Sequence, residues 1–298
     1  MCWGELLWDL FPDSARLGGA AANVAYHVAQ LGDPVRLISR VGDDELGRRA
    51  VAELAKAGVD TQGVQVDDAF PTGTVRVDLV GGEARFSMDK HAAWDRIDCD
   101  ARAGHALRDA RAVVFGTLAQ RTPLARGALA EALALRPADA VRLCDLNIRA
   151  PFATREVVEA AVRCADVFKL NEAEAERLGE LFGVADPVSW LLDDHAAALV
   201  ALTRGARGCL LTTPRARAEH GGWASASDGG DRVGAGDAFV AVLACALTRR
   251  PPRELDATEL SALAEQANLY ASFVASESGA MPVVPPALRA RVRGMLGP

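Results

Sequence analysis

Short apolar runs alternate with helix-like segments along most of the chain. Buried strands are predicted at residues 112–115, 141–145, 166–170, 198–202 and 209–211. Helices are predicted at residues 123–135, at 154–164 and from Asn171 onward. Strands separated by one helix each imply βαβ units with right-handed crossovers, and therefore a largely parallel sheet. In such sheets ligands bind beyond the carboxyl ends of the strands.

One region, residues 72–90, breaks this alternation. Apolar and polar side chains alternate at residues 74–80 and 83–88, on either side of Gly81-Gly82. Two glycines between alternating runs are typical of a two-residue β-turn. We expect a β-hairpin that serves as a lid, or as a flap through which a homodimer forms. An edge hairpin of the main sheet is the alternative.

A loop of small residues runs directly into an apolar helix over residues 240–247. The loop contains Gly234, Ala235, Gly236 and Asp237. The N–H groups of a first helical turn are unpaired and carry the positive end of the helix dipole, so small residues leave them open to an anion. A carboxylate beside that anion suits phosphoryl transfer, in which it orients an alcohol and takes its proton. An ordinary loop with Asp237 as a helix-start residue is the alternative.

A second turn of small residues lies near the beginning of the chain. Gly18 and Gly19 allow close backbone approach at the start of a predicted helix, in which Asn23 offers a donor and an acceptor. Asp9 is expected to project from the carboxyl end of the first strand. Together these groups suit the hydroxyls of a sugar. His27 falls at an interior helix position, which predicts a packed side chain.

Composition and charge narrow the function. Of the 298 residues, 50% are apolar and 24% charged, which excludes a disordered or collagen-like chain. The net charge of −7 argues against a nucleic-acid or membrane-surface binder, which needs a basic face. Six scattered cysteines form no C-x-x-C motif, and no cationic leader or long apolar stretch occurs. We expect a single soluble α/β domain in the reducing cytoplasm.

Competing motifs lack essential residues. The stretch from Gly42 to Arg48 has the glycine spacing of a phosphate-binding loop, but it lacks Lys-Ser/Thr and would present three carboxylates to a phosphate. Gly234-Ala235-Gly236 has no third glycine for a dinucleotide fingerprint. There is no H-E-x-x-H and no G-x-S-x-G.

The order of the motifs resembles the ribokinase/PfkB family of carbohydrate kinases. Gly18-Gly19-x-x-x-Asn23 lies early, and Asp231-x-x-Gly234-Ala235-Gly236-Asp237 lies late. Between them follow Gly42-Asp43-Asp44-x-x-Gly47, Asp145-x-Asn147-x-Arg149, Asn171-x-x-Glu174 and Thr203-x-Gly205-x-x-Gly208. The D-x-N-x-R stretch is similar to fructokinase-like members. The resemblance implies an α/β three-layer sandwich of the ribokinase type, with a mostly parallel central sheet and a small β lid.

The resemblance also implies an activity, the ATP-dependent phosphorylation of a hydroxyl of a ketose such as fructose. Its partners would be ATP and a small sugar, with no nucleic acid and no membrane. A kinase of a sugar acid, which Arg149 would pair, or of a nucleoside stays open. So does a non-catalytic sugar- or nucleotide-binding protein on the same fold.

Individual roles follow from the same resemblance. Asp237 would be the catalytic base, and the anion hole would be lined by Gly234, Ala235 and Gly236. The sugar would be held by Asp9, Gly18, Gly19, Asn23 and Arg149. The nucleotide would lie along Lys169, Asn171, Glu174, Thr203, Gly205 and Asn268, with Glu174 acting on Mg²⁺ through water. K⁺, used by many relatives, would be bound by Asp231 and by backbone carbonyls that include Val233 and the segment from Val274 to Gly279.

Two departures from the family pattern bear on these expectations. Arg232 stands where the family usually has Thr, which leaves a requirement for K⁺ open. The stretch between Asp9 and Gly18 is short, so the lid is expected to rest mainly on residues 72–90.

Overall fold

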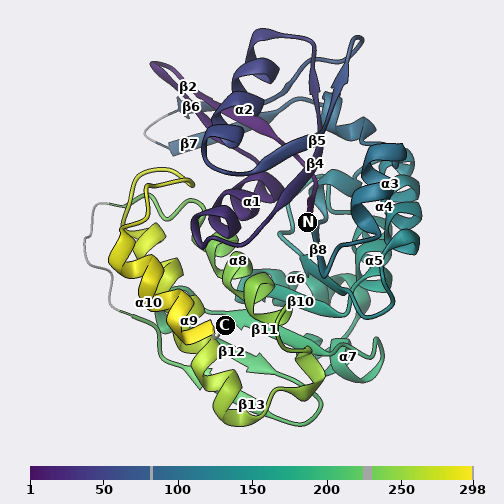
Figure 1. The fold of residues 1–298 in the computed structure, drawn as a ribbon. Coiled ribbons are helices and arrows are strands. Elements are labelled where there is room, and N and C mark those ends of the chain that lie inside the picture. Colours follow the sequence, from purple (N-terminus) through teal and green to yellow (C-terminus); the bar gives the residue numbers. More distant parts are fainter. Residues whose placement is uncertain (81–82, 224–229, 297–298) are drawn as a thin grey trace.

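Nine strands form one sheet in the computed structural model, which describes residues 1–80, 83–223 and 230–296 (Figure 1). In spatial order they are β13 (Arg217–His220), β12 (Cys209–Thr212), β11 (Leu199–Thr203), β10 (Val167–Asn171), β9 (Val141–Asp145), β8 (Ala112–Gly116), β1 (Cys2–Trp3), β4 (Arg36–Gly42) and β5 (Asp60–Asp67). All neighbours from β11 to β5 are parallel, whereas β12 and β13 pair antiparallel. The predicted largely parallel sheet is therefore confirmed.

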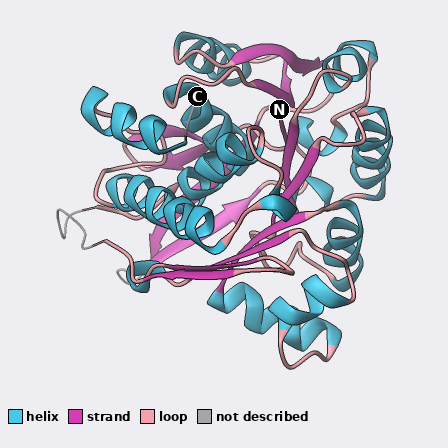
Figure 2. Cartoon of the chain, turned by 60° about the horizontal axis from the view of Figure 1, so that its bottom comes forward, coloured by secondary structure: helices cyan, strands magenta, loops and turns pink. Residues whose placement is uncertain are grey.

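Helices cover both faces of this sheet, which gives three layers (Figure 2). One face carries α1 (Ala20–Gln30), α2 (Glu45–Lys56), α8 (Ala235–Leu247), α9 (Ala257–Ala275) and α10 (Pro286–Leu296). The other face carries α3 (Ala101–Leu107), α4 (Pro123–Leu135), α5 (Arg155–Cys164), α6 (Glu172–Phe182) and α7 (Pro187–Asp193). Burial on both faces explains why the strands are continuous apolar runs. None of the helices in the described residues has the length and apolarity to cross a membrane.

Local side-chain chemistry sets where several helices begin. Thr122, Thr154 and Asn171 precede α4, α5 and α6, and each accepts a hydrogen bond from the N–H three residues later. Such N-cap bonds satisfy backbone donors that the helix itself leaves unpaired. The helix boundaries predicted from the sequence at these three places are confirmed.

The strands stay parallel, but the order in which the chain adds them to the sheet reverses at β1, which has β4 on one side and β8 on the other. In sheets of this kind the crevice for a ligand opens at the carboxyl ends of the strands beside such a reversal. Glu5 follows β1, Thr117 follows β8, and Asp145 ends β9. These positions therefore border the expected crevice.

A second, four-stranded sheet stands apart from the main one, in the order β3 (Ser14–Gly18), β2 (Leu7–Phe11), β6 (Gly73–Val80) and β7 (Glu83–Met88). The expected hairpin is present as β6 and β7, although its Gly81-Gly82 turn lies outside the described residues. Because β6 pairs with β2, the edge-hairpin alternative is wrong. The sheet is not built from residues 72–90 alone, since β2 and β3 supply its other two strands. Asp9 consequently lies inside β2 and not at the end of the first strand.

The glycine-spaced motif near Gly42 fixes the start of the hairpin to the main sheet. Asp44 accepts hydrogen bonds from Gly47 N at 2.7 Å, Thr72 N at 2.8 Å and Thr72 Oγ1 at 2.7 Å. Thr72 Oγ1 in turn accepts from Gly42 N at 3.0 Å, directly before β6 begins. The motif thus shapes a structural junction, in agreement with its rejection as a phosphate loop.

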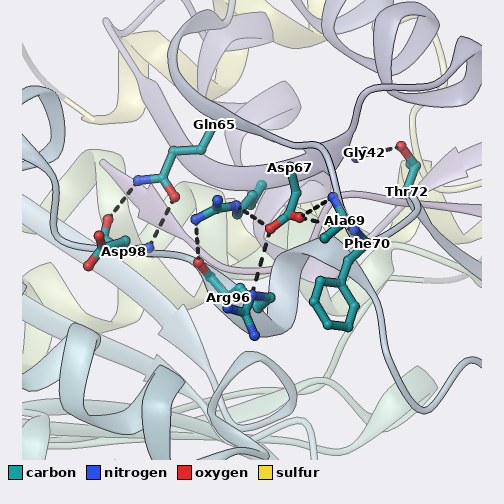
Figure 3. A network of polar contacts seen from close by, with 9 residues as sticks. Gly42, Gln65, Asp67, Ala69, Phe70, Thr72, Arg96 and Asp98 are labelled. Atoms are coloured by element: carbon teal, nitrogen blue, oxygen red, sulfur yellow. Dashed lines mark hydrogen bonds and ion pairs between the residues drawn. The ribbon is translucent and has the colours of Figure 1, made fainter.

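Two further carboxylates complete the attachment, and we call Asp44, Asp67 and Asp95 with their partners the anchor cluster. Asp67 accepts from Ala69 N and Phe70 N and pairs with Arg40 and Arg96 (Figure 3). Asp95 forms a buried ion pair with Arg121 at 2.6 Å. Arg121 also donates to the carbonyl of Asp89, just beyond β7, so both ends of the hairpin are tied to the rest of the fold.

Candidate active site

The start of α8 presents unpaired backbone donors at the predicted crevice. Gly234, its N-cap, has φ +79°, and a Cβ there would lie 2.6 Å from Ala280 Cα, so only glycine fits. Ala238 N donates to Gly234 O at 2.8 Å, the hydrogen bond that closes the first turn of the helix. The amides of Ala235, Gly236 and Asp237 therefore belong to the first turn, whose N–H groups have no helical acceptor. This geometry suits an anion.

Asp237 lies in that first turn and contacts the second predicted motif. Asn23 Nδ2, on α1, donates to Asp237 Oδ2 at 2.7 Å. Burial and the nearby Asp145 carboxylate raise the pKa of Asp237 to about 7. Asn23 Oδ1 is buried and has no hydrogen-bond partner in the structure. A buried acceptor without a donor is costly, and a ligand hydroxyl placed there would satisfy it.

The turn before α1 brings its backbone against the end of β1. Gly19 has φ +103°, and a Cβ would meet the carbonyl oxygen of Glu5 at 2.3 Å. Glu5 is buried, and its Oε1 accepts from Ala20 N at 3.0 Å. Burial raises the pKa of Glu5. Glu5 therefore holds the Gly18-Gly19 turn in place from the main sheet.

A buried ion pair lies beneath the start of α8. Lys169 Nζ, on β10, is 3.1 Å and 3.3 Å from the two carboxylate oxygens of Asp145, at the end of β9. A Cβ at Gly236 would lie 3.0 Å from Lys169 Nζ, so the ammonium sits directly against the anion-binding turn. Although burial lowers the pKa of Lys169, Asp145 and Glu174 raise it above its ordinary value. The lysine is therefore a fixed positive charge.

The predicted nucleotide residues gather at the ends of β10 and β11. Asn171 Oδ1 accepts from Glu174 N at 2.9 Å, and Glu174 Oε2 accepts from Asn171 N at 2.8 Å. Thr203 is aligned with Asn171 in the parallel register, and Gly205 follows it with φ +58°. Asn268, on α9, directs its amide group into the fold instead, donating to Ala264 O and Cys209 Sγ.

The predicted sugar side is assembled from both sheets. Asp9 projects over Gly18, where a Cβ would meet Asp9 Oδ2 at 2.8 Å. Burial raises the pKa of Asp9, against the opposing effect of Arg149 and Arg16. His27 is packed as predicted: its Nε2 donates to Ala280 O at 2.9 Å, and burial lowers its pKa to about 4.

The donor set fits a magnesium ion held through water. Asp145, Glu174 and Asp237 supply carboxylate oxygens, the ligand type that Mg²⁺ prefers. Across the part of the chain that the structure describes, no group of three or more His, Cys, Asp or Glu could hold a metal by itself. Mg²⁺ commonly keeps several waters and binds one or two carboxylates together with substrate phosphates. Such a mode suits Glu174.

Three residues of the site were not predicted from the sequence. Glu5 and Asp145 each lie directly after or at the end of a core strand, a position that could have indicated them. Asp145 even begins the D-x-N-x-R stretch. Arg16, which reaches Asp231 from β3, had no such local signal.

The fold and the site together define a phosphotransferase that acts on an alcohol group. The chain belongs to the family described as pfkB family carbohydrate kinase, whose profile matches residues 13–287. It is 31% identical over 303 residues to Fructokinase-1 of Oryza sativa subsp. japonica, covering 95% of this chain and 93% of that protein. The protein is therefore a sugar kinase.

Solved structures agree with this assignment. An uncharacterized sugar kinase, PH1459 from Pyrococcus horikoshii, superposes with a TM-score of 0.84 at 26% identity, with 99% of each chain covered. A fructokinase from Vibrio cholerae O395, solved in a fructose-, ADP- and calcium-bound form, gives a TM-score of 0.80 at 26% identity, with 98% of each chain covered. A double mutant of that fructokinase was solved in a fructose-, ADP- and potassium-bound form.

Proposed function

We propose that this sugar kinase transfers the γ-phosphoryl group of ATP to a hydroxyl of a ketose such as fructose. One contact carries the proposal, the hydrogen bond from Asn23 to Asp237 at the start of α8. It puts a carboxylate with a pKa of about 7 beside an unsatisfied acceptor and a turn of free backbone N–H groups. A base, a hydroxyl binder and an anion hole are the parts that phosphoryl transfer to an alcohol requires.

In this mechanism Asp237 accepts the proton of the attacking sugar hydroxyl, because a base with a pKa near the working pH is suited to that step. The N–H groups of Ala235, Gly236 and Asp237 stabilise charge on the phosphoryl oxygens. Lys169 adds a fixed positive charge directly under Gly236. Mg²⁺ bound through water at Glu174 would supply further charge neutralisation on the phosphates.

We assign the nucleotide to the ends of β10 and β11. Asn171, Thr203 and Gly205 border this edge of the sheet, beyond which ligands of parallel sheets bind. Asn268 would act through its carbonyl oxygen, since its amide group bonds Ala264 and Cys209. The relatives solved with ADP support a nucleotide partner.

We assign the sugar to the space between the two sheets, against Asp9, Gly18, Gly19, Asn23 and Arg149. Fructose is the preferred substrate, because relatives that are 30% and 31% identical to this chain are fructokinases. The four-stranded sheet would act as a lid over the sugar, on a single α/β domain.

Dimer formation through this lid and a cytoplasmic location remain predictions. Free thiols at all six cysteines suit a reducing compartment.

The test is an assay of ADP release with ATP and Mg²⁺ against fructose, other ketoses, aldoses, a sugar acid and nucleosides. Turnover with fructose at the highest kcat/KM supports the proposal. A preference for a sugar acid or a nucleoside would replace the ketose while keeping the kinase chemistry. Tight sugar binding by calorimetry with no ATP consumption, unchanged in Asp237→Ala, would indicate a binding protein and overturn the proposal.

A further inference from the structure

One ion pair joins the small sheet to the loop that leads into the anion-binding turn. Arg16 Nη1, on β3, donates to Asp231 Oδ2 at 2.8 Å across 215 positions of sequence. The guanidinium carbon lies 4.9 Å from the centre of the Phe11 ring, which supports the side chain from its own sheet. In the register of β2 and β3, Arg16 is aligned with Asp9. The arginine therefore lies between the sugar-side carboxylate and Asp231.

Asp231 shapes the loop on which the anion hole depends. Its Oδ1 accepts from Val233 N at 3.1 Å, and its Oδ2 also accepts from Gly279 N at 2.9 Å. The backbone between Asp231 and α8 turns through two left-handed residues, Arg232 at φ +61° and Gly234 at φ +79°. A side chain that receives N–H groups on both sides of such a turn fixes its course.

Asp231 is also the residue that the family resemblance gives to K⁺, and with the Arg16 guanidinium bound to its carboxylate the groups here do not fit that ion. Both carboxylate oxygens of Asp231 already accept N–H groups, and one of these donors is the amide of Gly279. The carbonyl of Val274 accepts from Glu277 N at 3.1 Å at the end of α9. K⁺ needs oxygen ligands, whereas these groups form hydrogen bonds with one another. Arg16 supplies the guanidinium that forms an ion pair with Asp231.

We propose that Arg16 is a positioning residue that takes the place of the monovalent cation. Closure of the lid brings its guanidinium to Asp231, which neutralises that carboxylate next to the phosphates and holds the loop in the shape that forms the anion hole. Phosphoryl transfer then needs no K⁺. The proposal rests on the proposed kinase function and adds to it a coupling between sugar binding under the lid and the order of the anion hole.

Stability alone does not account for this pair. The side chains of Arg16 and Asp231 are 44% and 33% exposed. Exposed ion pairs contribute little to the folded state because water and salt screen them. The effect of Arg16 is therefore expected in catalysis and in the response to cations, which a structural contact would leave unchanged.

The test compares the wild type with Arg16→Ala, Arg16→Lys and a matched control, Arg76→Ala. Arg76 is exposed on the same sheet, aligned with Leu10 and therefore on the face opposite Asp9. Kinetics are measured in KCl, NaCl and choline chloride at equal ionic strength. We expect the wild type and Arg76→Ala to be equally active in all three salts. In choline chloride Arg16→Ala should lose about tenfold in kcat/KM, which corresponds to the loss of one hydrogen bond to a charged group. In KCl the activity should recover, because the variant frees Asp231 Oδ2 for the ion.

A second variant and a binding readout keep the proposal separate from the kinase assignment. Asp231→Asn retains an acceptor for Val233 N while removing the charge, so adding it to Arg16→Ala should abolish the K⁺ effect. The melting temperature should be higher in KCl than in choline chloride only for Arg16→Ala, and this difference should appear whether or not a sugar is turned over. Lysine at position 16 should preserve most of the wild-type behaviour. A wild type that requires K⁺, or an Arg16→Ala variant that matches Arg76→Ala, would overturn the proposal.

Discussion

The anchor cluster and the active site both bury carboxylates, but they treat the charge differently. In the anchor cluster, burial alone would raise the pKa of Asp44, and hydrogen bonds from Thr72 and Gly47 bring it below its ordinary value. Asp67 follows the same pattern, with N–H donors and two arginines outweighing burial. Each carboxylate there has hydrogen-bond donors or arginine partners from the protein itself.

In the active site the balance is reversed. Burial raises the pKa of Glu5, Glu174 and Asp237, and the nearby Asp145 raises that of Asp237 further. The Asn23 acceptor beside them has no donor. Raised pKa values and a buried acceptor without a donor are typical of a site whose hydrogen-bond partners arrive with the substrate. Asp44 and Asp67 thus have enough donors around them to stay ionised and to fix the small sheet, whereas in the active site burial outweighs the donors that the protein supplies.

The largest expected effect is on turnover when Asp237 is replaced. Asp237→Asn should lower kcat by about 10³-fold, since it removes the proton acceptor but keeps the side-chain shape. A carboxyl whose pKa is raised by folding destabilises the folded state above that pKa, so the same variant should unfold at no lower urea concentration at pH 8. Steady-state kinetics and urea unfolding check both results. Retention of more than a tenth of the wild-type kcat would contradict the role of base.

Replacement of an anchor-cluster carboxylate should lower stability and leave kcat unchanged, the opposite of the effect expected at Asp237. Asp67→Asn weakens a buried pair with Arg40 and should lower the free energy of unfolding by about 2 kcal/mol, less than for a fully buried pair because Arg40 is partly exposed. The kcat measured well below the melting temperature should not change. Asp68→Asn, the exposed neighbour, is the matched control and should unfold like the wild type. Equal loss of stability in the two variants would contradict a structural role for Asp67.

A smaller effect is expected at Asn23. Asn23→Ala removes both the donor to Asp237 and the unsatisfied acceptor, so the KM for the sugar should rise about tenfold. The hydrogen bond from Asn23 lowers the pKa of Asp237, so the acidic limb of the pH–rate profile should move to higher pH. The free energy of unfolding should change by less than about 1 kcal/mol, because loss of the unpaired Asn23 acceptor and loss of the hydrogen bond to Asp237 act in opposite directions. Gln30→Ala, at the other end of α1, serves as the control.

The response to pH is the mildest way to separate the two regions. Below pH 7, kcat/KM should fall towards tenfold per pH unit as Asp237 is protonated. Stability should change little down to pH 6. His27, with its pKa lowered to about 4, contributes stability that is complete above its ordinary pKa and is lost as the pH falls, about 1 kcal/mol by pH 6. Protonation of Asp237, whose pKa is raised to about 7, offsets this loss by a similar amount over the same range. The lowered pKa values keep Asp44 and Asp67 ionised there. A pH–rate profile that stays flat to pH 5.5 would show that Asp237 is not the group whose protonation limits the rate.

Much of the main sheet and of its helices could be predicted, because the central strands are buried on both faces and helices such as α4, α5 and α6 carry their own cap. The small sheet could be predicted only in part. The apolar run from Leu7 to Phe11 continues from the first strand, and nothing local indicates that it leaves the main sheet after Gly4 to pair with β6. Strand pairing depends on partners that are distant in sequence.

The candidate site divides in the same way. The turns at Gly19 and Gly234 were evident because small residues before a helix have a local physical meaning. The position of Asp145 at the end of a strand was a local signal, but its pairing with Lys169 was not, and Arg16 had no local signal because its role comes from Asp231, which a distant loop brings to it.

The sequence by itself determined the order of the motifs, the alternation of strands and helices, and the free N–H groups at the start of α8. Those features depend on residues close together along the chain. The net charge of −7 could not say which carboxylates stay ionised or what each one faces. Only the tertiary structure decided that Asp44 is held as an anion in the anchor while Asp237 titrates near neutrality. The physical reason is that a pKa depends on burial and on neighbours in space, and packing brings those neighbours from every part of the chain.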